Sequence, residues 1–299
     1  MFKTNNLFFL VILFLGLILR CIYAYTGEIE LGGGDSSARA LLIFSSYLTE
    51  FKLFISTIWL PFYFFLYSLP LNFFYGANSL IYFQLMISII TLFSFVCLTK
   101  LENDPIQKAL VIFLISIMPA QLGMVSSVLS ELPFLMFILL AVNFYNTKNN
   151  YALALSCLCL LAATMIRFEG WFLYIVFLAF DFLKYKSPYR TLFLALPFLC
   201  VMGIYDIVQF KHTKIHFAGL VTNGDESSYV NIRNGYDSFF LRLQALIKII
   251  LSEGGLFYLL IPVGVYKALK TKSLSLMDSM AIISLSLLIE YNYQNLPLE

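Results

Sequence analysis

The chain has 299 residues, of which 61% are hydrophobic, 17% aromatic and only 12% charged, and its formal net charge is +2. Soluble domains carry about 25% charged residues, so this composition excludes an ordinary water-facing surface, and the mean hydropathy of +0.86 agrees. A net charge this small gives no reason to expect a nucleic-acid partner. We therefore expect an all-α, multi-pass integral membrane protein that forms a single transmembrane domain over residues 1–299.

Continuous apolar runs, taken in chain order, predict the helices. A membrane span needs about 20 apolar residues, and the run 7–25 nearly reaches that length. No small-residue cleavage site of the kind that ends a signal peptide follows it. We therefore expect an uncleaved first span with Lys3 in the cytoplasm. Further spans are expected at 79–99, 107–125, 129–146, 151–167, 170–184, 190–209, 249–267 and 276–292. The prediction is thus a bundle of about nine transmembrane helices.

The run 53–75 is long enough to span but is interrupted by Pro61, Pro70 and Asn72. If this run lies along the outer interface, nine cations fall on the cytoplasmic side, where short loops favour them. They are Lys100, Lys108, Lys148, Lys184, Lys186, Arg190, Lys267, Lys270 and Lys272. If the run spans instead, the same cations lie outside unless the N-terminus also does. We favour the first arrangement, which leaves outer loops at about 26–78 and 211–248.

The first outer loop contains Gly32-Gly33-Gly34-Asp35, followed by an expected short helix at 36–50. Two interpretations of Asp35 stay open: it caps this helix, since Asp is a favoured N-cap, or it is a carboxylate with a chemical role. Arg39 follows four residues later, so a cation accompanies that carboxylate.

Four further charged residues stand at the outer ends of expected spans: Arg20, Glu131, Arg167 and Glu169. A charge at the bilayer centre costs about 3 kcal/mol or more. Snorkelling to the interface explains each of them singly. Together with Asp35 they would gather at one membrane face, which makes them candidate site residues.

These motifs resemble the polytopic GT-C glycosyltransferases of the protein O-mannosyltransferase and lipid A aminoarabinose transferase type. The resemblance covers about residues 10–180. A first span ending in an Arg is followed by the Gly-Asp loop, and Trp59–Phe64 is similar to the family's Pro-Pro-Leu-Tyr-Tyr stretch. Ser130–Pro133 and Thr164–Trp171 are similar to later outer-face signatures. Many relatives have Asp-Glu at Asp35-Ser36 and continue further, so we expect a short or truncated member.

The resemblance implies a glycosyltransferase that moves a sugar from a polyprenyl-phosphate carrier to a protein, lipid or glycan acceptor. The transfer would take place at the extracytoplasmic face with inversion. A carboxylate would accept the proton of the attacking hydroxyl, a role that suits Asp35. Cations would stabilise the departing phosphate, a role that suits Arg167, with Arg20 and Arg39 as lesser candidates.

The resemblance assigns Glu131 either to positioning the acceptor or to binding a divalent cation, and places Glu169 beside the substrate. No resident metal site is predicted from the sequence itself. Cys157 and Cys159 lack a second ligand pair, and His212 with His216 lacks an evident third ligand.

Two other function classes stay open. The alternative function is a transporter or flippase of a lipid-linked or small substrate, and a non-catalytic membrane scaffold is the third. Transporters place ionisable sites near the bilayer midplane and often contain internal repeats. In this chain the charges gather at one face and no repeat is evident, so the enzyme is favoured.

Overall fold

A computed structural model of the chain describes part of its residues. These are 2–26, 40, 43, 61–71, 77–98, 112–113, 115–117, 122, 124–125, 129–147, 149–167 and 169–213. All elements of regular structure among them are helices, which confirms the all-α prediction for this part of the chain. The loop at Asp35 and Arg39 lies outside the described residues, as do the spans expected at 249–267 and 276–292.

The helices follow the apolar runs closely. They are α1 (Phe2–Thr26), α3 (Pro61–Leu71), α4 (Ala77–Leu98), α7 (Glu131–Asn146), α8 (Asn150–Thr164), α9 (Glu169–Tyr185) and α10 (Pro188–Thr213). Local signals set several of the ends. Asn149 caps α8 by accepting the backbone N–H of Tyr151 at 3.2 Å, and Pro188 opens α10 at the first helical position, which tolerates proline.

Two helices in the described part of the chain are long and apolar enough to cross a membrane: Asn78–Leu98 and Pro188–Ile207. The nine spans that we expected are not supported. The reason is length: α7 has 16 residues and α8 has 15, whereas an upright span needs about 20. Of the expected span at 107–125, only scattered residues are described. Membrane residence therefore rests on two helices, and the multi-pass topology stays a prediction.

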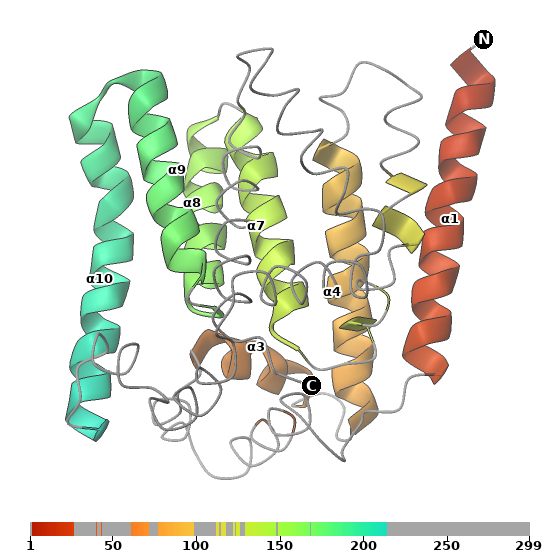
Figure 1. The fold of residues 1–299 in the computed structure, drawn as a ribbon, viewed down its shortest axis with the longest axis horizontal. Helices are drawn as coiled ribbons and strands as arrows, with labels where there is room; N and C mark the ends of the chain where they lie inside the picture. The colour runs from red at the N-terminus through yellow and green to blue at the C-terminus, as the bar shows by residue number, and fades with distance from the viewer. Residues whose placement is uncertain are drawn as a thin grey trace, which may run out of the picture. The chain divides into compact units, whose positions relative to one another are not determined.

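The chain divides into two compact units, Met1–Gly170 and Trp171–Glu299. In the first unit α4 packs against both α1 and α7, and α7 packs against α8 (Figure 1). α3 runs crosswise at one end of these upright helices in Figure 1, and its Tyr63 and Tyr67 join Leu132 of α7 in one buried cluster. The single domain expected over the whole chain stays a prediction.

In the second unit, α10 returns antiparallel to α9 (Figure 1). The Tyr174 hydroxyl donates to the Leu194 carbonyl oxygen at 2.8 Å, and the Tyr174 ring stacks on Phe198 with 4.6 Å between centroids. Trp171 meets the same Phe198 edge-on. Aromatic packing therefore joins the first turns of α9 to the middle of α10.

Residues 61–71 of the expected run 53–75 form the 11-residue helix α3. This helix is too short to cross a bilayer, since about 20 residues are needed. The rest of the run lies outside the described residues, so its placement along the outer interface stays a prediction.

Candidate functional site

Arg167 lies in the link between α8 and α9, immediately after the last turn of α8. One carbonyl oxygen accepts two hydrogen bonds at the end of α8: the N–H groups of Ile166 and Arg167 both donate to the Ala163 carbonyl oxygen at 3.1 Å. The Arg167 carbonyl then accepts the N–H of Gly170 at 3.1 Å. These bonds fix the backbone from which the Arg167 side chain departs.

Gly170 allows this tight link. A Cβ atom at that position would lie 2.8 Å from backbone atoms of Ala163 and Thr164. Only glycine lets the two chain segments approach this closely. No pattern in the sequence predicts that residue 170 must be glycine.

The Arg167 side chain forms an ion pair with Glu131, the first residue of α7. Its Nη1 contacts Glu131 Oε1 and also donates to Ser130 Oγ at 3.3 Å. A carboxylate in the first turn of a helix is favoured by the helix dipole, so Glu131 is well placed by its own helix. Arg167 is 25% exposed and Glu131 36%, which leaves the pair half-buried and reachable from outside.

Glu131 and Arg167 were predicted from the sequence to lie in one cluster, and the structure brings these two together. Glu169 lies at the start of α9, and its side chain is outside the described residues. The partner of Arg167 described by the structure is thus Glu131 on α7.

α3 lies directly against this link. The Phe62 N–H donates to the Met165 carbonyl oxygen at 3.2 Å, and the Phe62 ring packs on Phe137 of α7 with 5.9 Å between centroids. The start of α3 is therefore bonded to the chain two residues before Arg167. An apolar helix thus lies beside the charged pair, a contact that the sequence did not predict.

A buried polar network ties α3 to α4. The Tyr67 hydroxyl bonds Gln84 Oε1, and Gln84 Nε2 donates to the Met124 carbonyl oxygen at 2.8 Å. Tyr67 and Gln84 are both fully buried. Buried amides need such partners, so this network holds α3 in its crosswise direction.

Arg20 is fully buried in α1. Its Nε donates to Ser88 Oγ of α4 at 2.9 Å, and its Nη1 donates to the carbonyl oxygens of Gly16 and Ser116 at 3.1 and 3.2 Å. Nη2 reaches the Ile115 carbonyl at 3.5 Å. These contacts are with protein backbone and a neighbouring helix. The geometry therefore gives Arg20 a helix-packing role rather than an exposed position for a phosphate.

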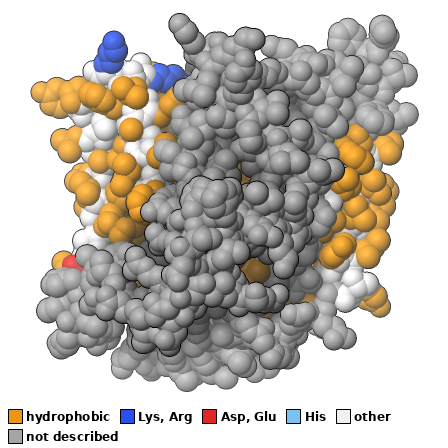
Figure 2. All heavy atoms as spheres, in the orientation of Figure 1, with side chains coloured by type: hydrophobic (Ala, Val, Ile, Leu, Met, Phe, Trp, Pro, Cys, Tyr) orange, Lys and Arg blue, Asp and Glu red, His pale blue; other side chains and the backbone are white. Residues whose placement is uncertain are grey.

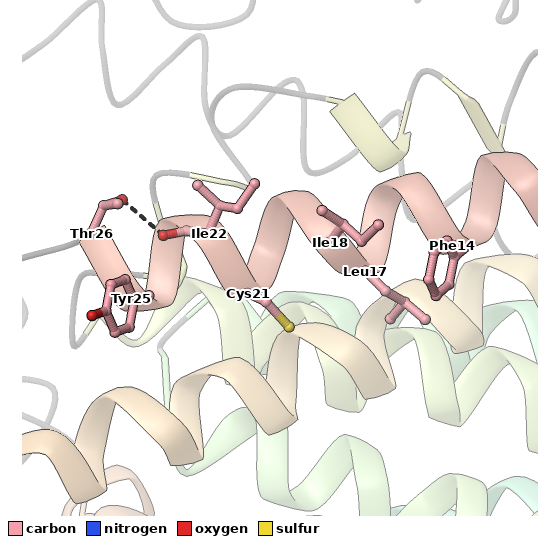
Figure 3. Close-up of a pocket in the computed structure, with 7 residues that line it drawn as sticks. All are labelled: Phe14, Leu17, Ile18, Cys21, Ile22, Tyr25 and Thr26. Carbon is pink, nitrogen blue, oxygen red and sulfur yellow. Dashed lines mark hydrogen bonds between the residues drawn. The ribbon is translucent and has the colours of Figure 1, made fainter.

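An apolar hollow lies along α1, lined by Phe14, Leu17, Ile18, Cys21, Ile22, Tyr25 and Thr26 (Figure 3). All of these side chains come from one helix. The one hydrogen bond drawn there runs from Thr26 Oγ1 to the Ile22 carbonyl at 2.8 Å. A hollow without a charged lining residue is unsuited to a phosphate, so the pair at Arg167 is the better candidate site.

Within the described part of the chain, no group of three or more His, Cys, Asp and Glu side chains is arranged to hold a metal ion. No protein-family model, curated protein or solved structure matches this chain. Among the described residues, those around Arg167 therefore form the candidate site.

Proposed function

We propose that this chain is a membrane glycosyltransferase of the GT-C type, which moves a sugar from a polyprenyl-phosphate carrier to an acceptor at the extracytoplasmic face, with inversion. The observation that supports it is the Arg167–Glu131 pair, half-buried at the ends of α7 and α8 and bordered by α3. Such a site combines a cation for a phosphate with an apolar helix for an isoprenoid chain.

Arg167 is the phosphate-binding residue of the proposal. When the bond between the anomeric carbon and the carrier phosphate breaks, negative charge grows on the phosphate oxygens. An arginine guanidinium matches a phosphate with two parallel N–H donors. Both contacts with Glu131 and Ser130 are made by Nη1, so they fix the plane of the guanidinium before the carrier binds. This preorganisation strengthens stabilisation of the leaving group.

Asp35 is the proposed general base. It would accept the proton of the acceptor hydroxyl while the hydroxyl oxygen forms its bond to the anomeric carbon from the face opposite the phosphate. Asp35 lies in the first expected outer loop. In this scheme Glu131 orients Arg167 and holds no metal ion.

α3 would carry the isoprenoid chain. Phe65 and Leu69 of this helix are 45% and 38% exposed, although its other side bears the buried Tyr63 and Tyr67. Exposed apolar side chains beside a charged pair suit a ligand with a phosphate head and a hydrocarbon tail.

The test is sugar transfer by the full chain in membranes, with polyprenyl-phosphate hexoses carrying a radiolabel in the sugar. We expect label to move to an acceptor fraction with wild-type protein and to stay on the carrier with Arg167→Ala. A Lys184→Ala variant, which removes an exposed cation from the second unit, is the matched control and should retain transfer. If no labelled hexose is transferred by any preparation, the glycosyltransferase proposal is wrong.

The alternative, a transporter or flippase, is favoured by one observation: Arg20 is an ionisable residue fully buried inside α1, and such residues mark substrate pathways in transporters. Its donors, however, are directed at backbone carbonyls. Movement of a labelled lipid-linked sugar across proteoliposomes, without transfer to an acceptor, would support this alternative.

A further inference from the structure

The turn between α9 and α10 presents two exposed lysines, Lys184 and Lys186. Tyr185 and Tyr189 beside them are 43% and 85% exposed. Figure 2 shows Lys and Arg side chains at one end of a surface whose other described side chains are mostly hydrophobic. Positive charge and exposed tyrosines are thus concentrated at this turn.

An internal ion pair shapes the turn. Arg190 Nε and Nη2 donate to the two oxygens of Asp181 at 2.8 and 2.9 Å, a two-pronged contact. The Arg190 guanidinium also lies over the Tyr185 ring, 4.1 Å from its centroid. Asp181 is fully buried. The carboxylate of the turn is therefore occupied by Arg190, and residues 181–190 keep a formal net charge of +2.

Lys186 has an unusual backbone conformation. Its φ is 51°, a left-handed value that a helix end normally gives to glycine. Its N–H donates to the Phe182 carbonyl at 2.7 Å, which closes the end of α9. A lysine at this position keeps a cation at the turn although glycine would fit the backbone better.

The turn also marks the beginning of a candidate membrane span. Pro188–Ile207 is long and apolar enough to cross a bilayer, and 17% of it is buried. Its Leu192, Phe193 and Leu196 are 63%, 75% and 56% exposed. If these side chains face lipid tails, the lysines a few residues earlier stand at the level of the lipid headgroups, where lysine and tyrosine are enriched.

We propose that the α9–α10 turn is a docking surface for anionic phospholipid headgroups, with Lys184 and Lys186 contacting the phosphates and Tyr185 and Tyr189 lying at the interface. Charge complementarity identifies the partner, because a +2 turn at the start of a lipid-facing helix meets negative phosphates at that depth. The proposal does not depend on the glycosyltransferase proposed above, since all of its residues belong to the second unit.

The experiment uses the full chain reconstituted in phosphatidylcholine vesicles that contain phosphatidylglycerol. Spin-labelled forms of both lipids report which headgroup is held at the protein surface. Wild-type protein should immobilise the phosphatidylglycerol probe preferentially, and added salt should reduce this preference, since exposed pairs are screened. Each lysine near an anionic surface is worth roughly fivefold in association, so Lys184→Gln with Lys186→Gln should remove most of the preference.

The matched control is Lys211→Gln with Lys214→Gln, which removes the same charge near the other end of α10. This control should keep most of the preference. If both double variants lost the same share of the preference for phosphatidylglycerol, that preference would depend on total charge and not on this turn, and the proposal would be overturned. An unchanged preference in the Lys184/Lys186 variant would overturn it as well.

Lys186 allows a test that separates charge from folding. Lys186→Arg should keep the lipid preference, whereas Lys186→Gln and Lys186→Gly should both reduce it. Lys186→Gly should nevertheless unfold at a temperature no lower than wild type, because glycine accepts the left-handed backbone. A Lys186→Gly protein that keeps the full preference would rule out a contact between this ammonium group and the lipid.

Discussion

A Cβ atom added to Gly170 would lie 2.8 Å from the backbone carbonyl of Ala163. That contact is with backbone, which cannot rotate away as a side chain can. The link that carries Arg167 therefore exists only because residue 170 lacks a side chain.

Gly170→Ala should consequently destabilise the protein. Overpacking of this kind costs about 1–3 kcal/mol, to be measured by denaturant unfolding in detergent. Gly203→Ala is the matched control, since a Cβ at that helical position would meet no atom within 4 Å beyond its chain neighbours and its own helix backbone. That control should gain roughly 0.5–1 kcal/mol from better helix propensity. Effects of the same sign in both variants would contradict the close approach at Gly170.

Gly16→Ala should also destabilise, for a different reason. A Cβ at Gly16 would lie 2.8 Å from both Cβ and Oγ of Ser116, next to the carbonyl that Arg20 holds. Because that neighbour is a side chain, it can be removed. Ser116→Gly should restore much of the stability lost in Gly16→Ala, and a double-mutant cycle measures this coupling. Additive losses would show that the two residues do not meet.

Much of the helical structure could be predicted from the sequence. The apolar run 79–99 became α4 at Ala77–Leu98, and 129–146 became α7 at Glu131–Asn146. Hydrophobic runs decide such helices locally, and their ends were wrong by a few residues. The span count was less successful, because several runs gave helices shorter than a bilayer requires.

The contacts of the candidate site could only partly be predicted. The Glu131–Arg167 cluster was expected from charges at helix ends, but the burial of Arg20 was not. Its carbonyl partner Ser116 lies 96 positions away along the chain, and no local pattern marks a backbone carbonyl as a partner. The hydrogen bond from Phe62 to Met165 was missed for the same reason.

Arg190→Ala should destabilise the second unit strongly. It leaves the fully buried Asp181 carboxylate without its two-pronged partner, and losing one partner of a buried pair costs about 3–5 kcal/mol. Arg190→Ala combined with Asp181→Asn should recover part of the loss, since no buried charge then remains. Thermal unfolding of the wild-type protein and the two variants provides the measurement. A double variant no more stable than Arg190→Ala would argue against this account.

Arg167→Lys should weaken productive donor binding, and Arg167→Ala should nearly abolish it. Lysine keeps the charge but lacks the planar fork that meets a phosphate with two donors. The measurement is the dependence of sugar transfer on carrier concentration for the three proteins. Glu131→Gln should lower the maximal rate less than Arg167→Ala, because it disturbs only the orientation of the guanidinium. If Arg167→Ala has wild-type carrier dependence, Arg167 is an interfacial anchor.

Asp35→Asn should lower turnover at least about a hundredfold, the lower end of typical general-base contributions. The substitution preserves size and hydrogen bonding while removing basicity. Ser36→Ala, a neighbouring change that leaves the carboxylate intact, should retain most of the activity. Turnover near the wild-type rate in Asp35→Asn would assign Asp35 to capping the helix expected after it.

The shortness of α7 and α8 bears on how the protein enters a bilayer. The two helices are joined through Thr147–Asn149 and tied by Ser156 Oγ, which donates to the Ala141 carbonyl at 2.8 Å. A helix shorter than the hydrocarbon thickness draws its flanking polar residues inward or thins the bilayer around it. Here those flanking residues include Glu131 and Arg167. Their opposite charges neutralise each other when α7 and α8 pack together as a hairpin. Were α7 and α8 to enter a bilayer, closing first would lower the charge that the hairpin carries into lipid, and insertion as a pair would be favoured.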